Sequence, residues 1–445
     1  MVRLASSILL ASLAATAFAA SSPPKCSTNS HCPEEYPCCS QYGECGTGAY
    51  CLGGCDPLTS YSLDSCEPQP VCQSTTYKWD NLDKSALNTK YLGNASESDW
   101  VYSGFPKVKD GNLMLTMPKE SVGSLFANNH YIWYGKISGK IKSSRGAGVV
   151  TAFILLSDTK DEIDFEFVGS DLNKVQTNYY FQGILNYDQG TKETVDSSTF
   201  DDWHTYEIDW KPEAITWSVD GKVKRTLTRD STWNETANRY EFPQTPSRMQ
   251  LSLWPAGQAS NAEGTIEWAG GEIDWDSQDI KDKGYYYAQY SDITVECYDP
   301  PKGTDKSGNK SYVLTNKDGL DSSIKITNND TVLASFGATG LDPDVKPSKS
   351  GSSSSSSSTG NTVPENRGGS GNEPGNSNST SSDSGSSTST GSGSSSTGGS
   401  GFSQGGNDDS SSSSSDSNGA VSPNERVLRS SLFAVLVAVV VLVTL

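Results

Sequence analysis

The chain has 445 residues, which is too long for one ordinary domain. Its formal net charge of −19 argues against nucleic-acid binding, because phosphates are bound by Lys and Arg side chains. Its three His residues lie far apart and its acids lack the spacing of an EF-hand loop, so we expect no metal and no cofactor.

The N-terminus has the pattern of a secretory signal peptide. Residues 1–19 combine an Arg near the start, an apolar stretch and Ala17-Phe18-Ala19, which is typical of a cleavage site. A short transmembrane helix is the alternative, but the apolar run is too short to span a bilayer comfortably. We therefore expect a secreted protein.

Residues 20–72 are predicted to form a small disulfide-rich module. Nine of the ten Cys residues lie between Cys26 and Cys72, a density that fits an oxidising compartment. A disulfide-bonded spacer and a binding module are both compatible with this composition.

The segment CCSQYGECGTGAYC, residues 38–51, resembles hevein-type chitin-binding modules of carbohydrate-binding family 18. That resemblance implies chitin contacts from Ser40, Tyr42 and Tyr50, whereas a further aromatic position of those modules holds Glu44 here. It also implies three disulfides: Cys26–Cys39, Cys32–Cys45 and Cys38–Cys51. Cys55 would pair with Cys66 or Cys72, leaving the other to reach Cys297, and the sequence alone does not decide between these pairings.

Residues 73–300 are predicted to be an all-β domain. Short segments of alternating or apolar residues predict strands at 111–117, 131–141, 148–156, 162–168, 174–182, 203–210, 214–219, 247–254 and 292–298. Asp220-Gly221 between two of these patterns is a strong signal for a two-residue hairpin. Many short strands in one block indicate a β-sandwich or jelly roll.

One predicted strand carries three acids on one face. In DEIDFEF, residues 161–167, alternation places Glu162, Asp164 and Glu166 opposite Ile163, Phe165 and Phe167. An exposed amphipathic strand is the simpler interpretation, but it predicts mixed charges, because like charges close together destabilise a sheet. No Lys or Arg interrupts this row, and an apolar strand precedes it.

The row favours a retaining glycosidase. That mechanism needs two carboxyl groups about 5–5.5 Å apart, one as nucleophile and one to donate and later accept a proton. On a flat strand the Cα atoms of Glu162 and Glu166 lie about 13 Å apart, so we expect a concave sheet with side chains leaning inward. Asp164 between them is expected to bond the nucleophile and to separate the pKa values of the cluster.

A second alternating segment competes with this row. In GEIDWD, residues 271–276, Glu272, Asp274 and Asp276 alternate, but no apolar strand precedes them. We interpret that segment as a loop or cleft rim. We interpret His204 as a core or supporting residue rather than a catalytic one.

Polar and aromatic residues on neighbouring strands predict a sugar cleft. Rings stack on the C–H faces of sugars, and amides bind their hydroxyl groups. The candidate substrate contacts, besides Glu166, are Asn178, Tyr180, Gln182, Arg248, Trp254, Thr265, Trp268 and Trp275. Core packing is the alternative for each Trp.

DEIDFEF resembles the E-x-D-x-E signature of glycoside hydrolase family 16. Together with QTNYYFQG, SLWPAGQ and WAGGEIDW, it resembles the fungal Crh cell-wall transglycosylases. The resemblance spans about residues 73–300 and implies a concave β-jelly roll with Glu162 as nucleophile, Asp164 as assisting acid and Glu166 as general acid/base. The implied reaction cleaves chitin and transfers the fragment to β-glucan in the cell wall.

The C-terminal third is polar and then apolar. Residues 301–346 are an extension of uncertain order, and 347–418 are a Ser/Thr/Gly-rich stalk that cannot bury enough apolar surface to fold. Small residues near Asn418, a polar spacer and the apolar end of 419–445 match a GPI-anchor signal, with a membrane span as the alternative. Sequons for glycosylation occur at Asn94, Asn234, Asn309, Asn329 and Asn378.

Three functions are compatible with these features. They are a chitin–glucan transglycosylase, a hydrolase of chitin or β-glucan, and a wall protein that only binds chitin. The acid row argues against the third, while the first two share one glycosyl-enzyme and differ only in whether sugar or water attacks it. We expect chitin, β-glucan and a membrane lipid as partners, at the outer cell surface and in the wall.

Overall fold

The structure is a computed structural model that describes residues 22–347 and 361–365. The predicted signal peptide, most of the stalk, Asn378, Asn418 and the C-terminal segment 419–445 lie outside these residues. In the described part of the chain, every helix is too short or too polar to cross a membrane.

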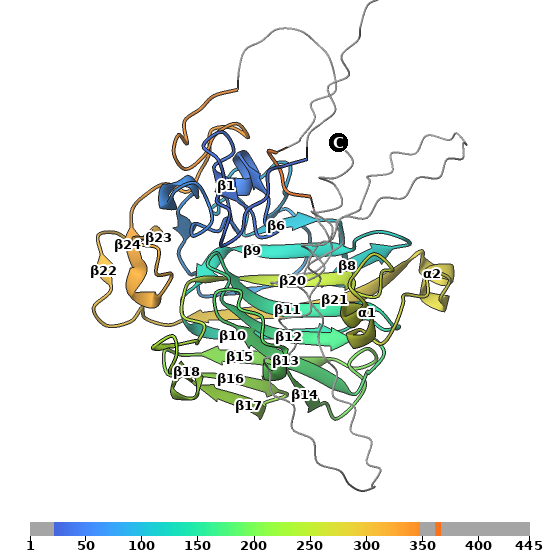
Figure 1. Ribbon diagram of the computed structural model, residues 1–445. Coiled ribbons are helices and arrows are strands. Elements are labelled where there is room, and N and C mark those ends of the chain that lie inside the picture. The colour runs from blue at the N-terminus through green and yellow to red at the C-terminus, as the bar shows by residue number, and fades with distance from the viewer. Residues whose placement is uncertain (1–21, 348–360, 366–445) are drawn as a thin grey trace, which may run out of the picture. The chain divides into compact units, whose positions relative to one another are not determined.

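Two eight-stranded sheets stack face to face (Figure 1). The first has the order β14 (Thr191–Thr194), β13 (Lys174–Tyr180), β12 (Glu162–Val168), β11 (Val149–Ser157), β20 (Ser247–Pro255), β9 (Ser124–Ile132), β6 (Trp100–Ser103) and β5 (Ser85–Leu87). The second has the order β17 (Lys222–Thr228), β16 (Ala214–Val219), β15 (His204–Trp210), β10 (Gly135–Lys142), β21 (Tyr285–Cys297), β8 (Asn112–Pro118) and β7 (Phe105–Lys109), and β4 (Thr75–Tyr77) pairs with β21.

The hydrophobic core lies between the two sheets. Alternate residues of β12 and β20 enter it, namely Ile163, Phe165, Phe167, Met249, Leu251 and Leu253. The other sheet contributes Trp210 and Trp217, both fully buried. The predicted β-sandwich is therefore confirmed, and the intervening residues of β12 and β20 are turned away from the core.

Turn geometry explains where the predicted strands begin and end. The Asp220-Gly221 hairpin is confirmed: both residues have positive φ, 50° and 73°, and they join β16 to β17. The predicted strand 131–141 is in fact two strands, because the chain turns at Tyr134 (φ 61°) between the end of β9 and the start of β10. The predicted strand 174–182 is too long, because β13 ends at Tyr180.

The Cys-rich module is a small knot built on the hairpin of β1 (Cys38–Cys39) and β2 (Cys45–Gly46). Short 3-10 turns, η1 (Gly48–Cys51) and η2 (Leu63–Ser65), follow the hairpin. Its disulfides include the three pairs that the hevein-like pattern implies, Cys26–Cys39, Cys32–Cys45 and Cys38–Cys51. Of the alternatives left open, the structure has Cys55–Cys66 and Cys72–Cys297, and the latter joins the two ends of the sandwich domain.

The polar extension 301–346 is folded against the module. Its strands β22 (Asp305–Lys306), β24 (Ile324–Thr327) and β23 (Ser311–Leu314) form a sheet with β3 (Gln69–Pro70). Leu333 and Ala338 share a buried cluster with Tyr50 and Leu52 of the module. The remaining elements are β18 (Trp233–Asn234), β19 (Arg239–Tyr240), α1 (Glu263–Trp268), α2 (Gln278–Lys283), η3 (Tyr187–Gln189), η4 (Arg229–Thr232) and η5 (Asp321–Ser323).

A short piece of the predicted stalk, residues 361–365, also contacts the module. The backbone amides of Thr47 and Ala49 donate to the carbonyls of Asn361 and Thr362, both at 2.8 Å. Main-chain hydrogen bonds do not need apolar side chains, so the polar composition that argued against a folded stalk does not prevent this contact.

Candidate active site

Glu162, Asp164 and Glu166 lie in a row on β12, on the face turned away from the core. All three side chains are buried, with Glu166 the most exposed at 7%. β12 is paired on both sides, with β11 and with β13, so the row lies inside the sheet rather than at its edge. Three buried carboxyl groups inside a sheet do not fit the alternative of an exposed amphipathic strand, whose charges would lie in water.

The two strands beside the row differ in polarity. On β11 the acids are paired with Leu156, Ile154 and Ala152, which form a small buried cluster of their own. On β13 they are paired with Tyr180, Asn178 and Gln176. The row thus has an aliphatic strip on one side and groups able to bind hydroxyls on the other.

β20 adds a second polar row beyond the aliphatic strip. Arg248, Gln250, Ser252 and Trp254 occupy this face. The Oε1 atom of Gln250, the Nε1 atom of Trp254 and, on β13, the Nδ2 atom of Asn178 are buried without a hydrogen-bond partner. An unsatisfied buried polar group costs about 1–3 kcal/mol, so this face is suited to a polar ligand that would pair with these atoms.

Trp254 and Trp268 form an aromatic wall at one end of the row. Their rings stack with centroids 6.1 Å apart and an interplanar angle of 28°. The Nε1 atom of Trp268, on α1, donates to Oε1 of Gln176 at 2.9 Å, which fixes the ring beside the polar side of the row. Thr265 lies on the same helix and is buried.

Two predicted contacts lie elsewhere. Gln182 does not share a face with Asn178, because β13 has ended and Gln182 has φ 48°; its side-chain amide donates to the carbonyls of Asp318 and Gly319 in the extension. Trp275 is separate from the aromatic wall and packs against Tyr286 of the second sheet, with centroids 6.2 Å apart. This contact matches the core-packing alternative for Trp275, and a sugar contact by Trp275 stays a prediction.

Asp161 anchors the start of the acid row and was not singled out from the sequence. Its buried carboxylate accepts hydrogen bonds from the backbone amides of Gln182, Gln244 and Thr245, and from the Thr245 hydroxyl. Burial raises the pKa of Asp161 to about 6, and these bonds oppose the shift. From the other sheet, Trp217 donates to the Asp164 carbonyl at 3.0 Å, so β12 is held from two directions.

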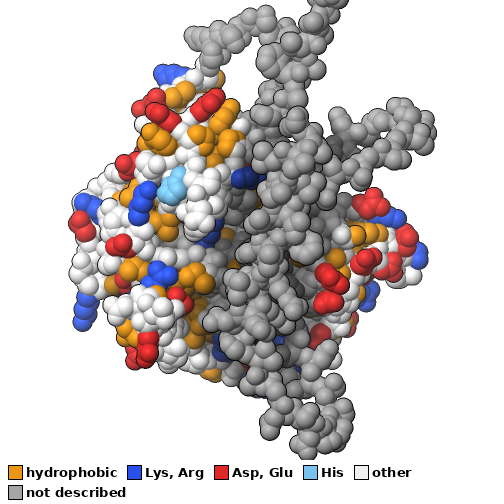
Figure 2. All heavy atoms as spheres, in the orientation of Figure 1, with side chains coloured by type: hydrophobic (Ala, Val, Ile, Leu, Met, Phe, Trp, Pro, Cys, Tyr) orange, Lys and Arg blue, Asp and Glu red, His pale blue; other side chains and the backbone are white. Residues whose placement is uncertain are grey.

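The competing acids of GEIDWD lie in a loop, as the sequence analysis proposed. Glu272, Asp274 and Asp276 are exposed, and Asp276 pairs with Lys119 at 2.9 Å. Figure 2 shows acidic side chains gathered beside α1 and α2, the region that contains this loop. His204 is buried on β15, where its ring bonds Asp220 and Ser197, which fits a supporting role.

The module residues Ser40, Tyr42 and Tyr50 line a pocket at the boundary between the module and the first sheet. Glu44 is not in this pocket; it is buried and its carboxylate pairs with Lys25 at 2.6 Å. Glu44, which stands where hevein-type modules have an aromatic residue, therefore forms an ion pair within the module.

Among the described sequons, Asn309 and Asn329 are exposed. Asn94 and Asn234 are half-buried, and the Asn234 amide donates to Glu241 at 3.0 Å. Glycosylation at Asn234 requires that bond to break.

Comparison of the sequence with known proteins shows the family to which the chain belongs. Residues 94–270 match the model of glycosyl hydrolases family 16. The chain is 71% identical to Crh-like protein 2 of Aspergillus fumigatus over the whole of both chains. It is 47% identical to Congo red hypersensitive protein 2 of Saccharomyces cerevisiae, over 72% of this chain and 69% of that protein.

Among solved structures, the chain is similar to one titled Crh5 transglycosylase in complex with NAG. The identity is 32%, the match covers 61% of this chain and 99% of that one, and the TM-score is 0.49. On the sequence matches, the chain belongs to the Crh-like proteins of glycosyl hydrolases family 16, a family of enzymes that act on glycosidic bonds.

Proposed function

We propose that the chain is a retaining transglycosylase that cleaves chitin and transfers the released fragment to β-glucan in the cell wall. The observation that carries this proposal is the buried row Glu162, Asp164 and Glu166 on a sheet face with unpaired polar atoms and a Trp pair. Membership of the Crh-like family supports the same reaction class.

In the first step, Glu162 attacks and Glu166 protonates. A carboxylate oxygen of Glu162 bonds to the anomeric carbon while the bond to the glycosidic oxygen breaks, and Glu166 gives its proton to that oxygen. The aliphatic strip of Ala152, Ile154 and Leu156 keeps water from one side of the acids.

In the second step, an acceptor hydroxyl replaces the leaving group. Glu166, now ionised, takes the proton of the acceptor hydroxyl, whose oxygen bonds to the anomeric carbon as the ester with Glu162 breaks. Asp164 lies between the two and is placed to orient Glu162. The β configuration is kept, because two displacements occur.

The second candidate is hydrolysis without transfer, and the two differ only in the attacking oxygen. Water gives shortened chitin, and a glucan hydroxyl gives a hybrid polymer. Trp268, which is half-buried and stacks on the buried Trp254, offers an apolar ring face to a sugar, and this favours a bound acceptor over water.

The test mixes chitin oligomers with a fluorescent laminarin-type acceptor. Labelled product of high mass supports transfer, and only shortened donor supports hydrolysis.

Glu162→Gln and Glu166→Gln are each expected to lower turnover at least about a hundredfold, since each removes one of the two groups that the mechanism needs. Glu272→Gln, in the exposed loop, is the matched control and is expected to keep full activity. If both active-site variants remain active, the site assignment is wrong.

The same proposal places the protein at the outer face of the cell membrane through a GPI lipid on Asn418, with the module and stalk facing the wall. The measurement is release of protein from intact cells by a phospholipase specific for phosphatidylinositol. Release of protein that ends at Asn418 and lacks residues 419–445 supports the anchor, and retention of protein with an intact C-terminal segment supports a membrane span.

A further inference from the structure

The pocket between the Cys-rich module and the first sheet has walls from both. It has about 80 Å³ of space that water-sized molecules can reach, and it opens to solvent. The module contributes Ser40, Gln41, Tyr42 and Tyr50, and the sheet contributes residues of β6 and β9 together with Arg248 of β20.

Buried polar atoms without partners gather around this pocket. They are Oγ of Ser40, Nε2 of Gln41, Nε of Arg248 and, beside it on β20, Oε1 of Gln250. Ser40 is 2% exposed, Arg248 4% and Gln250 fully buried. The module and the first sheet thus both supply hydrogen-bond donors and acceptors, which the hydroxyl and acetamido groups of N-acetylglucosamine require. Tyrosine rings lie beside them.

The module and the first sheet also contact each other directly through these residues. Oε1 of Gln41 accepts from Nε2 of Gln250 at 3.3 Å and from Nη2 of Arg248 at 3.5 Å. Gln250 is paired with Ile154, which is paired with Asp164, so Gln250 lies two strands from the acid row, about 10 Å away. A few linked sugar rings cover that distance along one face.

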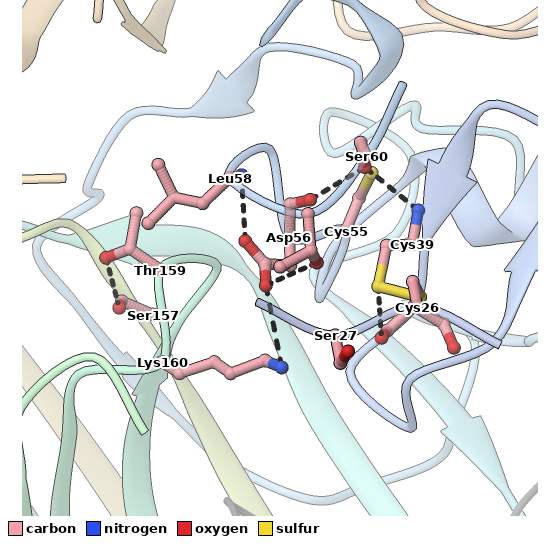
Figure 3. A network of polar contacts seen from close by, with 12 residues as sticks. Cys26, Ser27, Cys39, Cys55, Asp56, Leu58, Ser60, Ser157, Thr159 and Lys160 are labelled. Carbon is pink, nitrogen blue, oxygen red and sulfur yellow. Dashed lines mark hydrogen bonds and ion pairs between the residues drawn. A yellow bond between two sulfur atoms is a disulfide. The ribbon is translucent and has the colours of Figure 1, made fainter. Parts of the chain in front are cut away.

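The module is held firmly in this position. Asp158, at the end of the β11 hairpin, accepts from the Gly54 amide at 2.9 Å and from the Gln69 amide at 2.9 Å. Figure 3 shows Lys160 of the same turn reaching Asp56 of the module, at 3.5 Å. A Cβ at Gly53 would lie 2.4 Å from Nη1 of Arg248, so a larger residue at this position would have to displace the guanidinium.

From this arrangement we infer that the module is not an independent anchor on wall chitin. It supplies a remote subsite, formed by Ser40, Gln41, Tyr42 and Arg248, for the same β-linked N-acetylglucosamine chain that lies over Glu162 and Glu166. This inference rests on the proposed function for the identity of that chain. The pocket between the module and the first sheet would then select long donor chains over short ones.

The experiment compares short and long donors in the full-length secreted protein. KM and kcat are measured for a chitin tetramer and octamer at saturating laminarin-type acceptor, for the wild type, Gln41→Ala and Tyr42→Ala. For the octamer alone we expect KM to rise about fivefold in either variant with kcat unchanged, because one stacking or bonding group is lost from a distant subsite. Tyr61→Ala, on the exposed side of the module, is the matched control and should change neither value.

Two further readouts separate the possible failures. Thermal unfolding shows whether each variant folds, and Gln41→Ala removes only a partly exposed polar group. Calorimetry in the Glu162→Gln background measures octamer and tetramer binding without turnover. The wild type could fail to process chitin while the octamer still binds more tightly than the tetramer, with that difference lost in Tyr42→Ala. In that case the proposed reaction is wrong and the subsite is supported. Equal effects on both donors, no effect, or weakened binding of the glucan instead would overturn the subsite.

Discussion

At the scale of single residues, several buried carboxyl groups have pKa values above the usual range. Burial, together with the charge of Asp330, raises the pKa of Glu67 to about 7. Burial raises the pKa of Asp158 to about 6 despite the opposing charge of Arg248 and three hydrogen bonds. Both groups belong to the contact between the module and the sandwich, so this contact carries part of the pH dependence of the fold.

The sign of that dependence follows from proton binding. In the unfolded chain these acids ionise near pH 4, whereas in the folded protein they hold their protons to about pH 6 or 7. The folded state binds more protons in this window, so the free energy of unfolding falls as pH rises through it. Asp279 acts in the opposite sense. Burial alone would raise its pKa, but hydrogen bonds and charges from Arg145 and Lys283 outweigh burial and lower it, so the stability that Asp279 contributes is lost only at pH values below the ordinary pKa of Asp.

Glu67→Gln tests this directly. Glu67 has a buried oxygen without a partner, so the amide removes the charge with little loss of bonding. We expect the variant to gain on the order of 1–3 kcal/mol of stability at about pH 7.5 and almost none at about pH 4, where Glu67 is protonated in both states. Tm is measured at both pH values, with Glu272→Gln as the exposed control. A gain of equal size at both pH values would contradict the assignment of this pKa.

Trp268 and Trp275 give a second residue-scale prediction. Trp268→Phe keeps a ring beside Trp254 but loses the hydrogen bond to Gln176, so we expect KM for the sugar to rise about threefold to tenfold with Tm nearly unchanged. Trp275→Phe, which loosens the packing on Tyr286, should lower Tm and leave KM alone. The reverse pattern would mean that the aromatic wall has been placed on the wrong Trp.

At the scale of elements, alternation predicted the strands that form the site. β12 and β16 begin and end where predicted, and β20 extends one residue further, because each has a clear apolar face or a strong turn beside it. The boundary errors at Tyr134 and Gln182 arise from residues with positive φ that are not glycine, for which the sequence has no strong signal. The edge strands β5 and β7, and β6 beside β5, were missed because they are short and mostly only partly buried.

The disulfide Cys72–Cys297 links elements that are 225 residues apart in sequence. Closing so long a loop restricts the unfolded chain, so replacing both Cys by Ser should lower the free energy of unfolding by about 2–5 kcal/mol. Chemical denaturation measures this loss. The double variant Cys26→Ser/Cys39→Ser, which opens a loop of separation 13, is the comparison and should cost less. A larger cost for the short loop would contradict the chain-entropy explanation.

At the scale of the whole molecule, the sequence predicted the parts and not their assembly. The cysteine spacing indicated a separate module, but nothing in it indicates that Gly54 meets Asp158 or that Gln41 meets Gln250. The polar composition of 301–346 gave no sign that this extension forms a sheet with Gln69–Pro70. Contacts between distant segments depend on shape and on single hydrogen bonds, which local patterns do not encode.

Asp158→Asn tests the assembly. The amide cannot accept all the bonds from Gly54, Tyr131 and Gln69 without turning a donor towards one of them. We expect faster amide exchange in residues 38–55 of the module, while β12 stays protected. Asp274→Asn, in the exposed loop, is the control. Uniform loss of protection across both sheets would instead show that Asp158 supports the entire fold.

If Glu162 is the nucleophile, it forms a covalent bond to the donor sugar. Glu166→Gln is incubated with a chito-oligosaccharide that carries a para-nitrophenyl leaving group, which needs no proton donor, and the protein is analysed by mass spectrometry of intact chains and peptides. Because Gln cannot deprotonate an acceptor, we expect an added mass equal to the donor glycosyl unit on the peptide that contains Glu162. An adduct on another residue, or release of product with inverted configuration and no adduct, would contradict it.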